Sequence, residues 1–241
     1  MTENSLYLHA LVKAAGKGTR MQEVTGGNIP KSLVEVQGVP VLVRTLNNVA
    51  SVADEITIVV RDSDDVTAKV AVKYGNLAYQ NVEMFPGTAE AVRAGIIKFT
   101  GENERLVLVA NGDDSSLIPR AVYQDLLQYH LSTGADCTTL GVCQNDSERK
   151  IKFYLGEDTI GKKAEYTGVF ISNIDWLKGN LDEIKIDRET GEKQISRIFE
   201  IARYRSLINM YIVTGDVWHG FNTPQDYIET LKKFSKQQNE K

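Results

Sequence analysis

Apolar positions in this chain form short continuous runs that alternate with segments of helical periodicity. Near-continuous apolar runs predict buried strands at residues 7–14, 55–60 and 105–110, where the chain reads YLHALVKA, EITIVV and RLVLVA. Between them, apolar positions spaced by three and four residues predict helices over residues 40–50 and 88–99. Strand and helix therefore alternate along the first half of the chain.

The same alternation continues with weaker signals. Ser or Asp caps and Gly75 bound a predicted helix over residues 62–75. A strand is expected at 77–84, a helix at 119–132 and a strand at 136–143. After a charged stretch, the pattern predicts strands at 166–172 and 207–213 and helices at 195–204 and 224–237. We expect an α/β fold with a mixed, mostly parallel sheet and helices on both faces, and ligands at the carboxyl ends of the strands.

The size and charge of the chain limit its partners. The 241 residues have no internal repeat or linker, so we expect one domain over residues 1–241. With 28 Lys+Arg against 32 Asp+Glu, no basic field favours nucleic acid or a membrane surface. No apolar run approaches the length of a membrane span, and the N-terminus lacks a signal-peptide pattern, so a cytoplasmic protein is expected. The two cysteines, Cys137 and Cys143, are expected to pack as small apolar residues on one face of a strand.

The turn after the first strand is the strongest chemical signal. In AAGKGTRM, Gly16 and Gly18 permit close approach to the backbone, while Lys17 and Arg20 supply positive charge. This combination suits a phosphate, although a plain turn whose cations face water is an alternative. Dinucleotide-binding and P-loop patterns fit poorly, because Met21 replaces the third glycine and no Gly-Lys-Ser/Thr follows at P-loop spacing.

Five ordered motifs give the chain a family resemblance. AAGKGTRM with Lys31 after it, PGTAEAV, NGDD, YTGVFIS and GFNTPQDY resemble the nucleotidyltransferases that join an NTP to a sugar 1-phosphate. The nearest resemblance is to the uridylyltransferase domain of the N-acetylglucosamine-1-phosphate enzymes, and it extends over roughly residues 6 to 235. It implies the nucleotide-diphospho-sugar transferase fold, similar to that of GT-A glycosyltransferases, with a nucleotide-binding part of about 1–115 and an acceptor-binding part of about 116–241.

The resemblance also implies a role for each motif residue. Arg20 would hold the triphosphate and Lys31 would neutralise the α-phosphate, so these two are the expected catalytic residues. Asp113 and Asn222 are the expected ligands of Mg²⁺, the expected cofactor. Thr88 is expected to contact the base and to cap its helix. The other expected nucleotide-binding residues are Ala14, Ala15, Gly16, Lys17, Gly18, Thr19, Gln80, Gly87 and Gly112. Gln80 is carried over despite a different spacing.

The acceptor is less well defined, because Tyr166 stands where the related enzymes carry an asparagine that helps to hold the sugar. Glu157, Tyr166 and Gly168 are candidate acceptor contacts, with a surface acid and a core aromatic as the alternatives for the first two. Asp114 is expected to tune the metal or to cap the following loop. Gly26 and Gly27 suggest a mobile lid between the two cationic motifs.

The expected reaction is attack by the acceptor phosphate on the α-phosphorus of an NTP, with UTP and a sugar 1-phosphate favoured. A cytidylyltransferase acting on choline phosphate or another non-sugar phosphate stays open, as does a non-catalytic nucleotide-binding or sugar-binding regulatory subunit. A glycosyltransferase fits less well, because the chain has Gly-Asp-Asp-Ser where those enzymes have an Asp-x-Asp triplet. No chain remains after Lys241 for a left-handed β-helix, so acetyltransferase activity is not expected.

Overall fold

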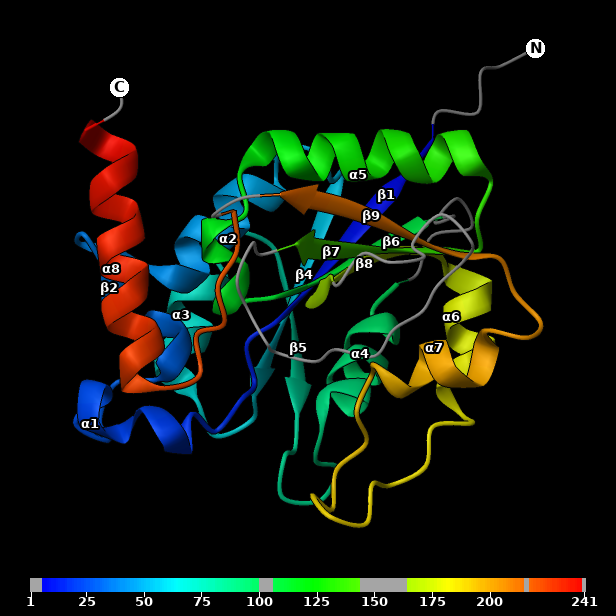
Figure 1. Cartoon of the computed structure of the whole chain (residues 1–241). Coiled ribbons are helices and arrows are strands. Elements are labelled where there is room, and N and C mark those ends of the chain that lie inside the picture. The colour runs from blue at the N-terminus through cyan, green and yellow to red at the C-terminus, as the bar shows by residue number, and fades with distance from the viewer. Residues whose placement is uncertain (1–5, 100–105, 144–163, 215–216, 240–241) are drawn as a thin grey trace.

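The computed structural model describes residues 6–99, 106–143, 164–214 and 217–239, and its centre is one seven-stranded sheet (Figure 1). The strand order is β5-β4-β1-β6-β8-β7-β9. All neighbours pair in parallel except β8, which runs antiparallel to both β6 and β7. The strands are β1 (Leu8–Lys13), β4 (Glu55–Arg61), β5 (Asn76–Gln80), β6 (Leu106–Asn111), β7 (Cys137–Cys143), β8 (Glu165–Asn173) and β9 (Ile208–Thr214).

Helices cover both faces of the sheet, as the alternating pattern predicts. One face packs against α4 (Thr88–Ile96), α6 (Ile174–Leu181) and α7 (Arg197–Ala202). The other packs against α2 (Val41–Val49), α3 (Asp65–Ala71) and α5 (Arg120–Thr133), and Figure 1 shows α5 running along the sheet. Every residue of β1 is buried, because this central strand is covered from both sides.

A third, smaller apolar cluster joins the two ends of the chain. Helix α8 (Pro224–Asn239) packs beside α1 (Gln22–Thr25) and the short hairpin of β2 (Glu35–Val36) and β3 (Val39–Pro40) (Figure 1). Met21, Val36 and Phe221 are fully or almost fully buried there. This cluster holds the segment before α8 against the turn after β1, two regions that are about 200 residues apart in sequence.

The predicted strands and helices are confirmed, with differences at their ends. Helix α3 is shorter than the predicted 62–75, because the Asp64 side chain caps it by accepting a hydrogen bond from Thr67 N. Gly75 lies beyond the helix, where a Cβ atom would meet the carbonyl of Ile56. Helix α6 is absent from the prediction. It follows β8 directly, and the Asn173 side chain caps its first turn.

Two expectations from composition can be compared with the described residues. Cys137 is fully buried in the core, whereas Cys143 is half-buried, and both thiols are free. Within the described ranges, none of the helices has the length and apolar character needed to cross a membrane.

Candidate active site

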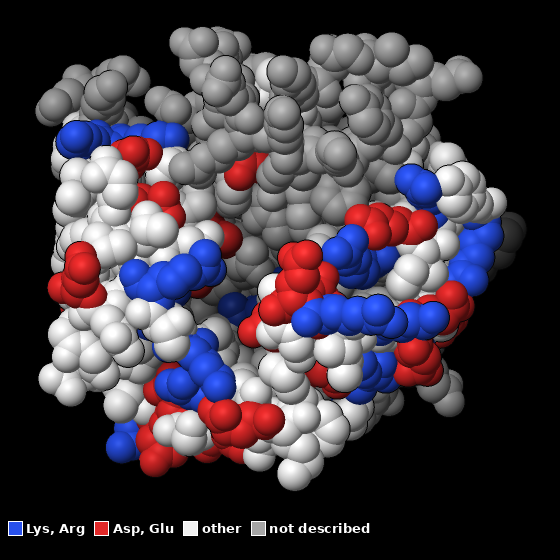
Figure 2. Space-filling model, turned by 60° about the horizontal axis from the view of Figure 1, so that its bottom comes forward, with Lys and Arg blue, Asp and Glu red and all other residues white. Residues whose placement is uncertain are grey.

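A cavity of about 470 Å³ opens at the carboxyl ends of β1, β5 and β6. Its lining comes from the turn after β1, the segment before α4, the end of β6, the segment before α7 and the segment before α8. Seen from below the view of Figure 1, basic and acidic side chains are interspersed on this face of the molecule (Figure 2). Most of the predicted site residues line the cavity, namely Ala15, Gly16, Lys17, Gly18, Thr19, Arg20, Lys31, Gln80, Gly87, Thr88, Asp113 and Asn222.

The turn after β1 is fixed by a glycine and an apolar anchor. Gly18 has a φ of 64°, and a Cβ atom on it would lie 2.8 Å from the Cβ atom of Lys31. Only glycine therefore allows the first cationic motif to approach the second this closely. The short 3₁₀ turn Thr19–Met21 follows, and its fully buried Met21 leaves Arg20 exposed at the cavity.

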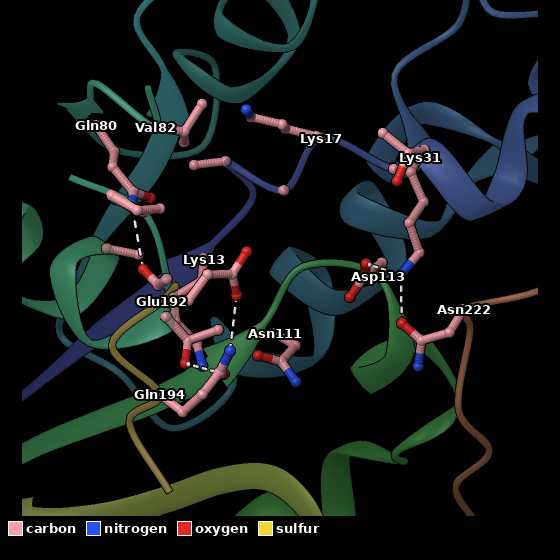
Figure 3. A pocket seen from close by; sticks show the side chains of 18 of the residues that line it. Lys13, Lys17, Lys31, Gln80, Val82, Asn111, Asp113, Glu192, Gln194 and Asn222 are labelled. Carbon is pink, nitrogen blue, oxygen red and sulfur yellow. Dashed lines mark hydrogen bonds and ion pairs between the residues drawn. The ribbon is translucent and has the colours of Figure 1, made fainter. Parts of the chain in front are cut away.

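Lys31 lies at the centre of the predicted catalytic group. Its Nζ atom is 2.6 Å from Asp113 Oδ2 and donates a hydrogen bond of 3.0 Å to Asn222 Oδ1 (Figure 3). Arg20 approaches the same Asn222 oxygen at 3.4 Å. The predicted catalytic and metal-binding residues, from four separate segments, therefore meet at one point.

Backbone and helix caps hold this group in place. Gly112 N donates to Lys13 O at 2.8 Å, and a Cβ atom at Gly112 would lie 2.9 Å from Leu42 Cδ1, so the chain turns tightly here. Asp226, buried in the first turn of α8, accepts hydrogen bonds from the backbone N–H groups of Asn222 and Thr223. The cap of α8 thus fixes the position of Asn222.

The two aspartates after β6 differ in the direction of their pKa shifts. Burial acts to raise the pKa of Asp113, but the charge and hydrogen bond of Lys31 outweigh it and hold that pKa below its ordinary value. Burial and the charge of Asp113 raise the pKa of Asp114 to about 7. The cap expected of Asp114 is formed by Asp113 instead, whose Oδ1 accepts from Asp114 N at the start of the turn Asp114–Leu117.

The oxygens of Asp113 and Asn222 fit a magnesium ion. Both already face a cation, the ammonium of Lys31, so the two hard donors converge on one position. Within the described ranges, no group of three or more His, Cys, Asp or Glu residues could hold a metal. Mg²⁺ needs no such cage when one or two protein oxygens act together with substrate phosphates.

The predicted base-binding residues lie at the start of α4. Gln80 Nε2 donates to the carbonyls of Phe85 and Gly87, at 2.8 and 3.0 Å, and so shapes the turn between β5 and α4. The prediction that Thr88 caps α4 is wrong. Gly87, which has no side chain, occupies the N-cap position, and Thr88 is the first residue of the helix. Thr88 Oγ1 instead accepts from Ile195 N and donates to Gln194 Oε1.

Tyr166 and Gly168, the two predicted acceptor residues within the described ranges, do not line the cavity. The Tyr166 ring packs edge-on against Phe199 at 5.3 Å, and burial raises its pKa well above the ordinary value. Gly168, with a φ of 83°, makes room for Asn111, since a Cβ atom there would meet the Asn111 amide nitrogen. Glu157 lies outside the described residues. Ala14 and Gly112 are buried next to the cavity without forming its lining.

Several lining residues are missed by the sequence argument. They are Lys13, Val82, Pro86, Ala91, Asn111, Glu192 and Gln194. Glu192 and Gln194 belong to an irregular segment whose backbone docks on the start of α4, and Gln194 Nε2 donates to Glu192 Oε2 at 2.7 Å. Lys13 carries a signal in the sequence, because it is a lysine at the end of a mostly apolar strand.

A family model identifies the chain as a nucleotidyltransferase. Residues 10–167, well over half of the chain, match the MobA-like NTP transferase domain, and the chain belongs to this family. The resemblance noted in the sequence is thereby confirmed.

Curated relatives extend the similarity to nearly the whole chain. The Bifunctional protein GlmU of Leifsonia xyli is 26% identical over 98% of this chain and 51% of its own length. The protein of the same name from Lactococcus lactis is 29% identical over 80% of this chain and 44% of its own length. The chain thus spans about half the length of these relatives.

Solved structures confirm the expected fold. The inositol-1-phosphate CTP transferase from T. maritima superposes with a TM-score of 0.69 at 15% identity, covering 95% of this chain and 96% of that one. The 4-diphosphocytidyl-2C-methyl-D-erythritolsynthase from Anaerococcus prevotii gives 0.64 at 19% identity, covering 95% and 98%. At these identities the similarity concerns the fold.

Proposed function

We propose that this nucleotidyltransferase couples an NTP, with UTP favoured, to a sugar 1-phosphate, giving a nucleotide sugar and pyrophosphate. The observation that carries the proposal is the position of Lys31, which is held between Asp113 and Asn222 beside the glycine turn. These are the groups that phosphoryl chemistry requires, namely cations for the developing charge and oxygens for a metal. The resemblance of the sequence motifs to uridylyltransferase domains supports UTP.

Different residues of the cavity have different roles in this reaction. Backbone N–H groups of the turn from Gly16 to Thr19 bind the phosphates, and Arg20 holds the triphosphate as pyrophosphate leaves. Lys31 neutralises the α-phosphate. Mg²⁺, held by Asp113 and Asn222, would supply charge neutralisation shared between the substrates. An acceptor phosphate is already an anion, so positioning matters more than a general base.

The lining of the cavity favours an acceptor with hydroxyl groups. Asn111, Glu192 and Gln194 offer amide donors and carboxylate or carbonyl acceptors, which are the partners of hydroxyl groups. A quaternary ammonium such as choline is instead bound by aromatic rings. A cytidylyltransferase is the second candidate, because two structural neighbours are named for cytidylyl products or CTP.

Pyrophosphate release with Mg²⁺ tests the proposal. UTP, CTP, GTP, ATP and dTTP are each paired with glucose 1-phosphate, N-acetylglucosamine 1-phosphate, mannose 1-phosphate, inositol 1-phosphate and choline phosphate. We expect turnover with UTP and a sugar 1-phosphate, lost in Lys31→Ala and retained in Lys73→Met, which changes an exposed lysine outside the cavity. Turnover with CTP alone would support the second candidate. Nucleotide binding without turnover would point to a regulatory subunit.

A further inference from the structure

Lys13 is a buried lysine that the proposed reaction does not use. It ends β1, its exposed fraction is 8%, and it lines the cavity. Two other lysines of the cavity have carboxylate partners, Glu83 for Lys17 and Asp113 for Lys31. Among the described residues, no carboxylate lies within ion-pair distance of the Lys13 ammonium. Lys13 is therefore a buried cation in the cavity lining without a direct counter-ion among the described residues.

Burial of the Lys13 ammonium is unfavourable in free energy, and a bound anion can offset this. Burial lowers the pKa of Lys13 to about 8, against the attraction of Asp114 and Asp113, so most molecules still carry the charge at pH 7. An ammonium offers three donors and no acceptor, and its natural complement is an anionic group rich in oxygen. Unpaired buried charges are rare outside functional sites.

The location of Lys13 separates it from the triphosphate cations. Arg20 and Lys17 are exposed on the turn, and Lys31 lies with Asp113 and Asn222. Figure 3 shows Lys13 with Glu192 and Gln194 on the opposite side of the cavity, and Asn111 between the two groups.

The neighbours of Lys13 in the sheet connect it to the predicted acceptor residue Gly168. In the parallel pairing of β1 and β6, Lys13 is in register with Asn111. Asn111 in turn lies against Gly168 of β8, where a side chain would displace it. Lys13, Asn111 and Gly168 thus form a row across three adjacent strands, leading from the nucleotide turn to the predicted acceptor residues.

We propose that Lys13, with Asn111 beside it, binds the phosphate group of the acceptor substrate. This inference rests on the proposed function, since a reaction that joins two phosphates must bring two anions into one cavity. Lys31 then faces the nucleotide α-phosphate from one side, and Lys13 holds the attacking phosphate from the other. The two cations offset the repulsion between the substrates.

Steady-state kinetics of Lys13→Met test this assignment, because methionine keeps the approximate length of the side chain and removes its charge. We expect the KM for the acceptor to rise at least tenfold while the KM for the NTP changes less than twofold. Lys13→Arg, which keeps the charge, should recover part of the acceptor affinity. Lys17→Met should affect the NTP instead, and the exposed Lys73→Met should change neither value.

Two kinetic results would overturn the proposal. A rise in the KM for the NTP alone would assign Lys13 to the nucleotide. Unchanged KM values in a folded Lys13→Met protein would assign it a structural role. Asn111→Ala gives a second, independent variant, and we expect it to raise the acceptor KM in the same direction.

A binding measurement decides the role of Lys13 even without turnover. Inorganic phosphate is titrated by calorimetry into protein saturated with Mg²⁺ and the non-hydrolysable α,β-methylene UTP. We expect wild-type protein to bind phosphate at least tenfold more tightly than Lys13→Met. Equal affinities, or no binding by either protein, would overturn the inference. Absence of pyrophosphate release with every substrate pair would count against the proposed function. It would not change what the phosphate titration says about Lys13.

Discussion

At the scale of single residues, a hydrogen bond between the Lys31 ammonium and the Asn222 side-chain oxygen joins segments that are 191 residues apart in sequence. Asn222 Oδ1 accepts from Lys31 and lies 3.4 Å from Arg20, while Asp113 pairs with Lys31 from the end of a central strand. The Lys31 and Asp113 side chains are 12% and 23% exposed, so the pair is only partly screened by water. Removing either partner leaves a partly buried charge without compensation.

Lys31→Ala should lower kcat by at least about 100-fold, the usual effect of removing one group that stabilises developing charge. Lys31→Arg should not restore full activity, because a planar guanidinium cannot replace a compact ammonium between two oxygens. Pyrophosphate release measures both variants, and circular dichroism checks their folding. A Lys31→Ala protein with nearly normal kcat would remove Lys31 from the chemistry.

A second prediction concerns stability and follows from the buried charge of Lys13. Burial lowers its pKa from 10.5 to about 8, so between these values the unfolded chain binds more protons than the folded one. The cost of the buried charge is therefore fully present below pH 8 and disappears as the pH rises toward 10.5. A shift of this size corresponds to about 3 kcal/mol, by the usual conversion of 1.36 kcal/mol per pKa unit.

Lys13→Met should accordingly be more stable than wild-type protein at pH 7, by up to about 3 kcal/mol, and the difference should shrink near pH 10. Urea unfolding at both pH values measures it. Comparing the two proteins at each pH cancels the titration of other groups. Equal stability at pH 7 would mean that the structure already compensates the charge.

Local sequence predicts some of these residues and not others. Arg20, Lys17 and the two glycines lie within five consecutive residues, so the short motif AAGKGTRM by itself indicates a phosphate-binding turn. Lys13 stands alone after an apolar run, where its long side chain could equally reach water from the end of the strand. Glu192 and Gln194 belong to a segment without periodicity, and only tertiary docking on α4 brings them to the cavity.

At the scale of elements, the start of α4 and the segment before α7 form a single unit. Ala89 N donates to Lys193 O, Lys193 N donates to Pro86 O, and Ile195 N donates to Thr88 Oγ1. Gly87 has φ 106° and ψ 164°, and a Cβ atom there would collide with the Lys193 backbone. The close contact between these segments therefore depends on a residue without a side chain.

Gly87→Ala should separate the two segments and cost about 2–4 kcal/mol, combining backbone strain with overpacking. Nucleotide affinity should fall at least tenfold, because Gln80, Gly87 and Thr88 line the same end of the cavity. The matched control is Gly179→Ala in α6, where the added methyl group has no atom within 4 Å apart from its chain neighbours and the backbone of its own helix. The control should be neutral or slightly stabilising. If both variants have the same stability and nucleotide affinity, the close contact with the Lys193 backbone does not require a glycine at position 87.

The strands and helices themselves are well predicted, for a physical reason. Strands such as β1, β4 and β6 are buried on both faces and therefore read as continuous apolar runs. Helix α6 is missed because it follows β8 directly, so no loop residues separate the strand pattern from the helix pattern. The antiparallel direction of β8 is likewise not encoded in its own pattern, and pairing with β6 and β7 decides it.

At the scale of the whole molecule, the site requires contacts across almost the full length of the chain. Lys31 and Asn222 meet only because α8 packs on α1 and the β2–β3 hairpin through the cluster that contains Met21, Val36 and Phe221. Binding of a nucleotide and Mg²⁺ across these segments should stabilise the fold as a whole, since the unfolded chain has no such site.

Thermal unfolding measures this coupling. At a nucleotide concentration about 100 times Kd, binding contributes about 2.7 kcal/mol, which raises Tm by roughly 5–10 °C for a chain of this size. Chelation of Mg²⁺ by EDTA should remove part of the rise, because the triphosphate then faces Asp113 without a bridging cation. Asn222→Ala should show a smaller Mg²⁺-dependent part than wild-type protein, while Gly179→Ala should keep the full response. If the nucleotide raises Tm by the same amount with Mg²⁺ and with EDTA, Asp113 and Asn222 do not bind the metal.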